Sequence, residues 1–232
     1  MKCILKKRPK NATIIQGFPS VGLVSTIATK FLIEHLDVEE IGYIHSEKIT
    51  PLAAIHKGRL IRPITLYYNK KHNLIIIQSL SEVRGLEWKL AEVILDMAKD
   101  IGAKEIIALE GTPAQTEDMK TYFYSTKTKI NSVKPIEEGV IMGVTATLFL
   151  KANKTPVTCI FTETHTNFPD SKAAAKVVGA LDKYIKINVD FKPLIKIAEK
   201  FEVNLKKYME QGKKLAPSIQ EESNEGKESY FG

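Results

Sequence analysis

The amino-acid sequence predicts an α/β fold with a mainly parallel sheet, an antiparallel hairpin insertion and a long C-terminal helix. Three observations support this class. The first 45 residues consist of a strand, a helix and a second strand, which is the order typical of parallel sheets. Residues 52–79 form short strand-like runs joined by short turns. After them, buried strands alternate with amphipathic helices.

The opening unit begins with a short apolar run at Ala12–Phe18, which we expect to form a buried strand ended by glycine and proline. A helix over Pro19–Leu36 follows, because proline is tolerated in a first turn and apolar residues line one face. A second strand is expected at Val38–His45. Four residues separate Gly17 from Gly22, which is the glycine spacing of a phosphate-binding loop.

This phosphate-loop pattern is incomplete. Leu23 and Val24 follow Gly22, where the motif requires a lysine and a hydroxyl residue that binds Mg²⁺. We therefore favour a structural turn, in which Gly17 allows a tight turn and Gly22 lets the helix approach the sheet. No nucleotide or other cofactor is expected. The alternative is an anion bound at the helix N-terminus near Ser20.

The remaining elements follow from the spacing of apolar residues and from turn signals. Short connections predict antiparallel hairpins among the strands Leu52–His56, Arg59–Tyr68 and Asn73–Ser79. Helices are expected at Gly85–Ile101, capped by Gly102, at Val140–Asn153, and at Ser171–Ile187, capped by Asp170 or Ser171. Further strands are expected at Lys104–Leu109, Thr121–Ser125 and Val157–Thr162. We therefore predict one α/β domain over residues 1–188.

The C-terminal region divides into a helix over Asp190–Leu215 and a polar tail over residues 216–232. Apolar positions in the helix alternate in steps of three and four, which indicates a narrow seam for another helix. We predict self-association through this seam; the alternative is a helix that lies back on its own domain. The seam residues are Phe191, Leu194, Ala198, Phe201, Leu205 and Tyr208.

The composition excludes several classes of protein. The net charge of +7 comes largely from lysines along residues 183–214, one helical region without an aromatic platform or arginine fork for bases, so we expect no nucleic-acid partner. The longest near-apolar stretch, Val140–Leu150, is too short to span a bilayer, and we expect no membrane partner. The two cysteines, Cys3 and Cys159, form no disulfide framework and suit a reducing cytoplasm.

Candidate chemistry is confined to the carboxyl ends of the predicted strands, where open α/β sheets bind ligands. Glu110, Glu163 and His165 follow two of these strands and could meet at one edge, as acid–base catalysis or a metal site would require. Polar strand ends around a solvated cleft are the alternative, which we favour. No metal-ligand spacing, nucleophile elbow or dinucleotide fingerprint is present, and no metal is expected.

Several segments together resemble the proteasome assembly chaperone family, in the branch that includes the second eukaryotic chaperone subunit and its archaeal homologues. The resemblance extends to about Ile187. It rests on the segments GFPSVGLVSTIA, SEKITPLAAIHKGR, AKDIGAKEIIALEGT, EGVIMGVTATLFLKA and FPDSKAAAKVVGALDKYI, in that order. The resemblance implies a three-layer α/β sandwich and a non-enzymatic, cytoplasmic chaperone or adaptor.

The resemblance also gives the tail a role. Chaperones and activators that bind proteasomes commonly end in a hydrophobic residue, a tyrosine and any residue. Here the last three residues are Tyr230, Phe231 and Gly232, so phenylalanine stands where tyrosine is expected. The implied partners are proteasome α subunits or another member of the family, besides the chain itself. The opposing function is a hydrolase- or phosphorylase-like enzyme that uses Glu110, Glu163 and His165.

Overall fold

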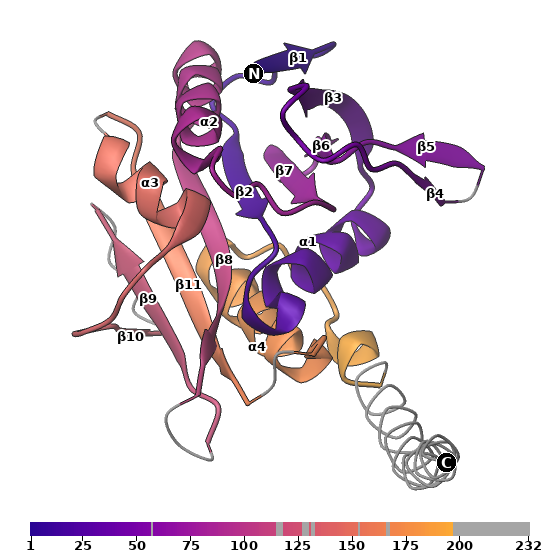
Figure 1. Ribbon diagram of the computed structural model, residues 1–232. Coiled ribbons are helices and arrows are strands. Elements are labelled where there is room, and N and C mark those ends of the chain that lie inside the picture. The colour runs from indigo at the N-terminus through magenta and orange to yellow at the C-terminus, as the bar shows by residue number, and fades with distance from the viewer. Residues whose placement is uncertain are drawn as a thin grey trace, which may run out of the picture.

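The computed structural model describes residues 1–56, 58–114, 118–126, 130, 133–152, 154–165 and 168–196. Their main feature is a mixed sheet in the strand order β1-β3-β6-β7-β2-β8-β11-β9-β10 (Figure 1). Along the chain its strands are β1 (Lys2–Leu5), β2 (Thr13–Gly17), β3 (Glu39–His45), β6 (Ile64–Asn69), β7 (Leu74–Ser79), β8 (Glu105–Pro113), β9 (Thr121–Ser125), β10 (Lys134–Pro135) and β11 (Val157–Thr164). A separate hairpin pairs β4 (Ala54–His56) with β5 (Arg59–Ile61).

The centre of the sheet is parallel and its flanks are antiparallel. Strands β7, β2, β8 and β11 run in one direction, with Ile15 of β2 opposite both Ile76 and Ile107. Strands β1, β3 and β6 pair antiparallel on one side, and β9 pairs antiparallel with β11 on the other. The central strands are buried on both faces, which explains why their sequences are continuous apolar runs.

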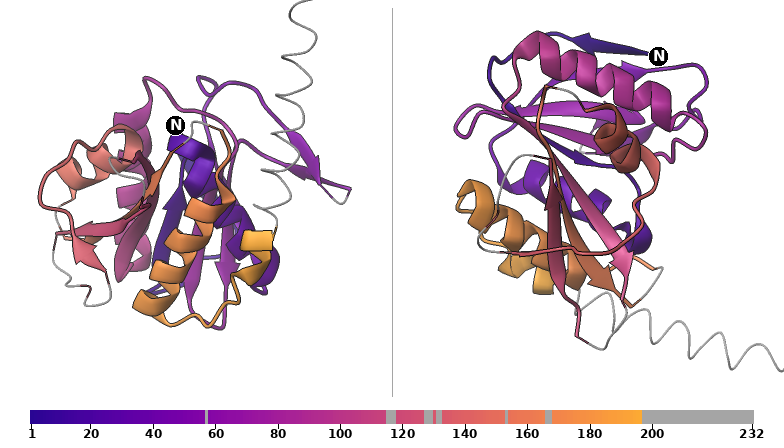
Figure 2. Two further views of the ribbon diagram at one scale, coloured as in Figure 1. Left: turned by 90° about the horizontal axis from the view of Figure 1, so that it is seen from below. Right: turned by 90° about the vertical axis from the view of Figure 1, so that its left-hand side faces the viewer.

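Helices cover both faces of the sheet, so the fold has three layers (Figure 2). Helices α2 (Glu87–Ile101) and α3 (Gly143–Lys151) pack on one face. Helices α1 (Val24–His35) and α4 (Ser171–Ile185) pack on the other. The α/β class and the layered arrangement expected from the sequence are confirmed, but the sheet is mixed where a mainly parallel one was expected.

In the simplest strand–helix–strand unit the two strands lie side by side, and in this structure β2 and β3 do not. Strands β2 and β3 do run in the same direction on either side of α1, yet β6 and β7 lie between them. The β6–β7 hairpin is therefore part of the main sheet. The expected strand Arg59–Tyr68 is divided into β5 and β6, because Pro63 has no N–H group for a ladder.

Helix boundaries depend on residues with left-handed backbone conformation. Helix α1 begins at Val24, after a short 3₁₀ turn η1 (Val21–Leu23), because Gly22 and Leu23 have φ angles of 63° and 48°. Helix α3 begins at Gly143 and not at the expected Val140, since Gly143 has a φ angle of 71°. The expected cap Gly102 is confirmed, with a φ angle of 63° at the end of α2.

Helix α4 begins at the expected position. The side chain of Asp170 accepts a hydrogen bond of 2.9 Å from the backbone N–H of Ala173. The Thr164 hydroxyl donates a hydrogen bond of 2.6 Å to the same carboxylate, so the cap is tied to the end of β11. This contact connects the α1–α4 layer to the sheet.

The two glycines that suggested a phosphate loop are explained by close packing. A Cβ atom on Gly17 would lie 2.6 Å from the backbone oxygen of Ser25 in α1. A Cβ atom on Gly22 would lie 3.0 Å from the Thr164 hydroxyl. On β8, a Cβ atom on Gly111 would lie 2.1 Å from the backbone oxygen of Val21. These glycines let the start of α1 lie directly on the strands.

The described part of the C-terminal region ends at Lys196. Residues 192–196 are helical, Leu194 is buried in the core, and the ring of Phe191 lies over Gly179 of α4. The rest of the expected helix Asp190–Leu215 and the whole tail 216–232 lie outside the described residues. Among the described residues, no helix is long and apolar enough to cross a membrane.

We predict that Gly17→Ala destabilises the fold by roughly 1–3 kcal/mol or more, because its methyl group would meet backbone atoms of α1 that cannot move independently. The free energy of unfolding in urea measures the effect. Gly139→Ala is the matched control, because its Cβ atom would meet only the flexible end of Ile136. Equal stability of Gly17→Ala and the wild type would show that the close approach does not exist.

Candidate functional site

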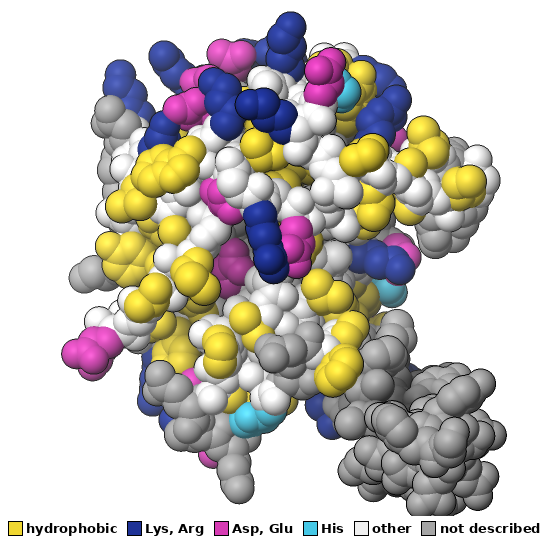
Figure 3. Space-filling view, viewed as in Figure 1, with side chains coloured by type: hydrophobic (Ala, Val, Ile, Leu, Met, Phe, Trp, Pro, Cys, Tyr) yellow, Lys and Arg dark blue, Asp and Glu magenta, His cyan; other side chains and the backbone are white. Residues whose placement is uncertain are grey.

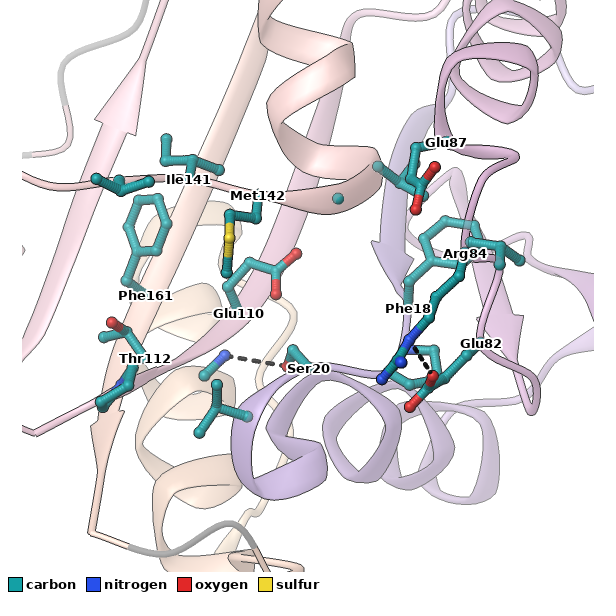
Figure 4. Close-up of a pocket in the computed structure, with 18 residues that line it drawn as sticks. Phe18, Ser20, Glu82, Arg84, Glu87, Glu110, Thr112, Ile141, Met142 and Phe161 are labelled. Atoms are coloured by element: carbon teal, nitrogen blue, oxygen red, sulfur yellow. Dashed lines mark hydrogen bonds and ion pairs between the residues drawn. The ribbon is translucent and has the colours of Figure 1, made fainter.

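A cavity of about 450 Å³ lies at the carboxyl ends of β2 and β8, beside the start of α3 (Figure 4). Its position is the one at which open α/β sheets bind ligands. Much of its lining is apolar, and it comes from the loop after β2, the loop after β7, the end of β8 and the segment before α3. The lining residues used below are Phe18, Ser20, Glu82, Arg84, Glu87, Glu110, Met142 and Phe161.

Three elements position a chain of hydrogen bonds beside the cavity. The side-chain amide of Gln16, fully buried on β2, donates a hydrogen bond of 2.8 Å to the hydroxyl of Thr145. Thr145, in the first turn of α3, in turn donates a hydrogen bond to the carboxylate of Glu110 on β8. Because the Thr145 hydroxyl accepts from one side and donates to the other, the arrangement fixes the side chain of Glu110.

Ser20 holds the turn after β2 against the neighbouring strand. Its hydroxyl accepts a hydrogen bond of 3.2 Å from the backbone N–H of Gly111 and lies 2.8 Å from the hydroxyl of Ser25 (Figure 4). Ser25 also donates to the backbone oxygen of Phe18. The wall of the cavity formed by this turn is therefore attached both to β8 and to α1.

Burial raises the pKa of the Glu110 carboxyl from 4.5 to about 7. Desolvation is the largest cause, since the charged form loses contact with water in the half-buried site. Hydrogen bonds from Thr145 and Ser20 act in the opposite direction and lower the pKa. The carboxyl therefore changes its charge near neutral pH, where an ordinary glutamate is fully ionised.

The rim of the cavity carries charges of both signs. The guanidinium of Arg84 lies 2.8 Å from a carboxylate oxygen of Glu82, and both side chains are largely exposed (Figure 4). Such an exposed pair contributes little to stability. Glu87, at the start of α2, also lines the cavity.

The structure places the three predicted polar residues in different surroundings. Glu110 lines the cavity, whereas neither Glu163 nor His165 is among its lining residues. Glu163 is buried at the end of β11, where its carboxylate accepts a hydrogen bond of 2.9 Å from the backbone N–H of Lys120. His165 is exposed at the next turn. Of the three, only Glu110 is therefore available to a molecule in this cavity.

The two cysteine thiols and the possible metal ligands are the remaining candidates for chemistry. Cys159 is buried beside Ala108 and Phe161, and burial raises the pKa of its thiol. Burial also raises the pKa of Cys3 to about 11, so neither thiol is activated as a nucleophile. Within the described ranges, no group of three His, Cys, Asp or Glu residues could hold a metal ion.

Sequence reasoning missed Thr145 and Met142 as residues of the site. Both fall in a segment that the sequence assigned to a continuous helix from Val140, whereas residues 140–142 precede the helix. A polar hydroxyl within the apolar stretch GVTATLFL was the available signal. Gln16 on β2 and Arg84 after β7 also lie at the carboxyl ends of strands, where the sequence placed candidate chemistry.

The fold and the cavity define an α/β protein with an open cavity at the carboxyl ends of parallel strands. The family model described as "PAC2 family" matches residues 14–209. The chain belongs to the PAC2 family, and the resemblance to proteasome assembly chaperones inferred from the sequence is confirmed. It is 30% identical to the uncharacterized protein MJ0106 of Methanocaldococcus jannaschii in an alignment of 223 residues, and the match covers 92% of this chain and 92% of that protein.

Solved structures of the same fold come from Pyrococcus furiosus. PbaA, an archaeal homolog of proteasome-assembly chaperone, is 30% identical with a TM-score of 0.80, and the match covers 93% of this chain and 99% of PbaA. Its monoclinic form matches at 28% identity and a TM-score of 0.82, covering 98% and 100% of the two chains. PbaB, an archaeal proteasome activator, has the same fold at 23% identity and a TM-score of 0.75, covering 90% and 98%.

Glu110→Gln should remove a pH dependence of stability. The folded-state pKa lies above the ordinary value of 4.5, so the stability that protonated Glu110 provides is complete at low pH and is lost as pH rises through about 7. Between about pH 5 and about pH 8, the wild type should lose roughly 2–3 kcal/mol relative to Glu110→Gln. Urea unfolding at both pH values measures this difference.

Glu87→Gln is the control for this measurement, because it makes the same chemical change at the rim of the same cavity. It should keep the pH dependence of the wild type. Identical pH profiles for the wild type and Glu110→Gln would contradict the assignment.

Proposed function

We propose that this chain is a non-enzymatic, cytoplasmic protein of the proteasome assembly chaperone type, which acts by binding other proteins. The observation that carries the proposal is its membership of the PAC2 family together with a similarity to PbaA over nearly the whole of both chains. Of Glu110, Glu163 and His165, only Glu110 lines the cavity, which supports the chaperone role over the enzymatic alternative. The proposed partners are proteasome α subunits, a related family member and the chain itself.

Exposed hydrophobic side chains support a role in protein binding. In Figure 3 they gather on the side of α3 and the neighbouring strands, and again on the β4–β5 hairpin. The first group includes Val140, Met142 and Leu150, which are 90%, 80% and 73% exposed. On the hairpin, Ile55 is 79% exposed. Clustered apolar surface of this kind is typical of protein interaction sites.

Self-association is the second part of the proposal. The three- and four-residue steps of the C-terminal seam continue from Phe191 and Leu194, which pack on α4, to Ala198, Phe201, Leu205 and Tyr208. We propose that the later positions contact the same segment of another copy. A first turn anchored on α4 would hold the segment in a defined direction for this contact.

Phe201→Lys combined with Leu205→Lys should reduce the mass measured by light scattering, because two charges would then lie in the apolar seam. The α/β domain should remain folded, as checked by circular dichroism. Asn204→Lys combined with Gln211→Lys is the control, since it adds the same two charges outside the seam. A wild-type protein that is monomeric at tens of micromolar would end this proposal.

Docking through the C-terminal tail is the third part of the proposed function. We propose that Tyr230, Phe231 and Gly232 dock in pockets of the proteasome α-ring. A single flexible peptide binds weakly, because ordering it costs conformational entropy. Several tails on one oligomer could gain about 10²–10⁴-fold by avidity if their spacing matches the pockets. Docking therefore depends on self-association.

Deletion of Tyr230–Gly232, or Phe231→Ala, should weaken binding to immobilised α-rings in surface plasmon resonance, because aromatic contact area is lost. Phe231→Tyr should strengthen it by restoring the hydroxyl that proteasome-binding tails carry. Ser229→Ala is the control and should bind as the wild type does. Equal binding by the wild type and the three-residue deletion would show that the tail has no part in docking.

A further inference from the structure

The cavity at Glu110 has the features of a small-molecule site, although two residues that line it, Val140 and Met142, also belong to the exposed apolar group described above. The carboxyl group of Glu110 points into the cavity, next to Met142 and across from Phe18 (Figure 4). One of its oxygens accepts the hydrogen bond from Thr145, which in turn is held by the buried amide of Gln16. A carboxylate is thus fixed in a largely apolar space by residues of three different elements.

The charges around the cavity favour a cationic occupant. Of the charged residues that line it, Glu82, Glu87 and Glu110 are acidic and Arg84 is basic. Arg84 is already paired with Glu82 at 2.8 Å, at the exposed rim. The start of α3 would attract negative charge, and the carboxylate of Glu110, bonded to the first turn of that helix, supplies it. A second anion would meet repulsion from Glu110 and from the rim.

We propose that this cavity binds a small organic cation, an ammonium or guanidinium group on an apolar body, whose charge pairs with Glu110. The apolar body would lie against Phe18, Phe161 and Met142. A volume of about 450 Å³ falls within the range of small-molecule sites. An ionised carboxylate in such a site needs a partner of opposite charge, which the ligand provides.

The affinity of the cavity for the cation should depend on pH. The cation binds the ionised carboxylate, and the empty site holds its proton up to a pH of about 7. Ligand binding should therefore release a proton, and affinity should fall as pH decreases below that value. A neutral ligand of the same shape would show no such dependence.

The probe is 2-phenylethylamine, with 2-phenylethanol as its neutral counterpart. The ε-methyl signal of Met142 in NMR spectra of the full chain reports binding, and the chain has only five methionines, so the signal can be assigned. At about pH 8 we expect saturable shifts with the amine at about millimolar concentration and much smaller shifts with the alcohol. Glu110→Gln should weaken amine binding by about tenfold or more, because the ion pair between the amine and the carboxylate is lost.

Glu47→Gln is the matched control and should keep the affinity of the wild type, since Glu47 is exposed and is not among the residues that line the cavity. If Glu110→Gln fails to fold, the pH dependence of amine binding to the wild type tests the same claim. Equal binding of amine and alcohol, an unchanged affinity in Glu110→Gln, or an equal loss in Glu47→Gln would overturn the proposal. These results do not depend on binding to α-rings.

Discussion

The structure depends on the close approach between the start of α1 and the parallel strands beneath it. Gly17 on β2 and Gly111 on β8 leave no room for a side chain against the backbone oxygens of Ser25 and Val21. This contact places Ser20 within hydrogen-bond distance of Gly111, and so fixes one wall of the cavity. A larger residue at either glycine would separate the helix from the sheet and open this wall.

The structure offers two kinds of surface, the cavity beside the start of α1 and a group of exposed hydrophobic side chains. The cavity is a concave site on rigid elements, in which the Gln16–Thr145–Glu110 chain of hydrogen bonds sets the position of a single carboxyl group. Exposed hydrophobic side chains suit a partner protein: Leu150 lies outside the cavity, whereas Val140 is 90% exposed and also lines it. The proposed protein contacts and the proposed small-molecule site therefore meet at Val140 and Met142, while Leu150 and Glu110 each belong to one of them alone.

Most elements could be predicted from the sequence because their apolar residues follow the period of a helix or of a buried strand. Strand order could not, since the position of β6 and β7 between β2 and β3 depends on long-range pairing. The start of α3 was misplaced because it depends on the left-handed Gly143, which hid the role of Thr145. Glu110 was placed at the correct edge, but the contact of Glu163 with Lys120 is tertiary and leaves no local signal.

The central claim is that this scaffold holds Glu110 in a protected cavity, where its carboxyl group titrates near neutral pH. The ¹³C chemical shift of the Glu110 carboxyl carbon, followed by NMR as a function of pH, tests it directly, and Glu110→Gln identifies the signal. A midpoint of about 7 is predicted. A midpoint near the ordinary value of 4.5 would contradict the account, because the carboxyl would then be exposed to water.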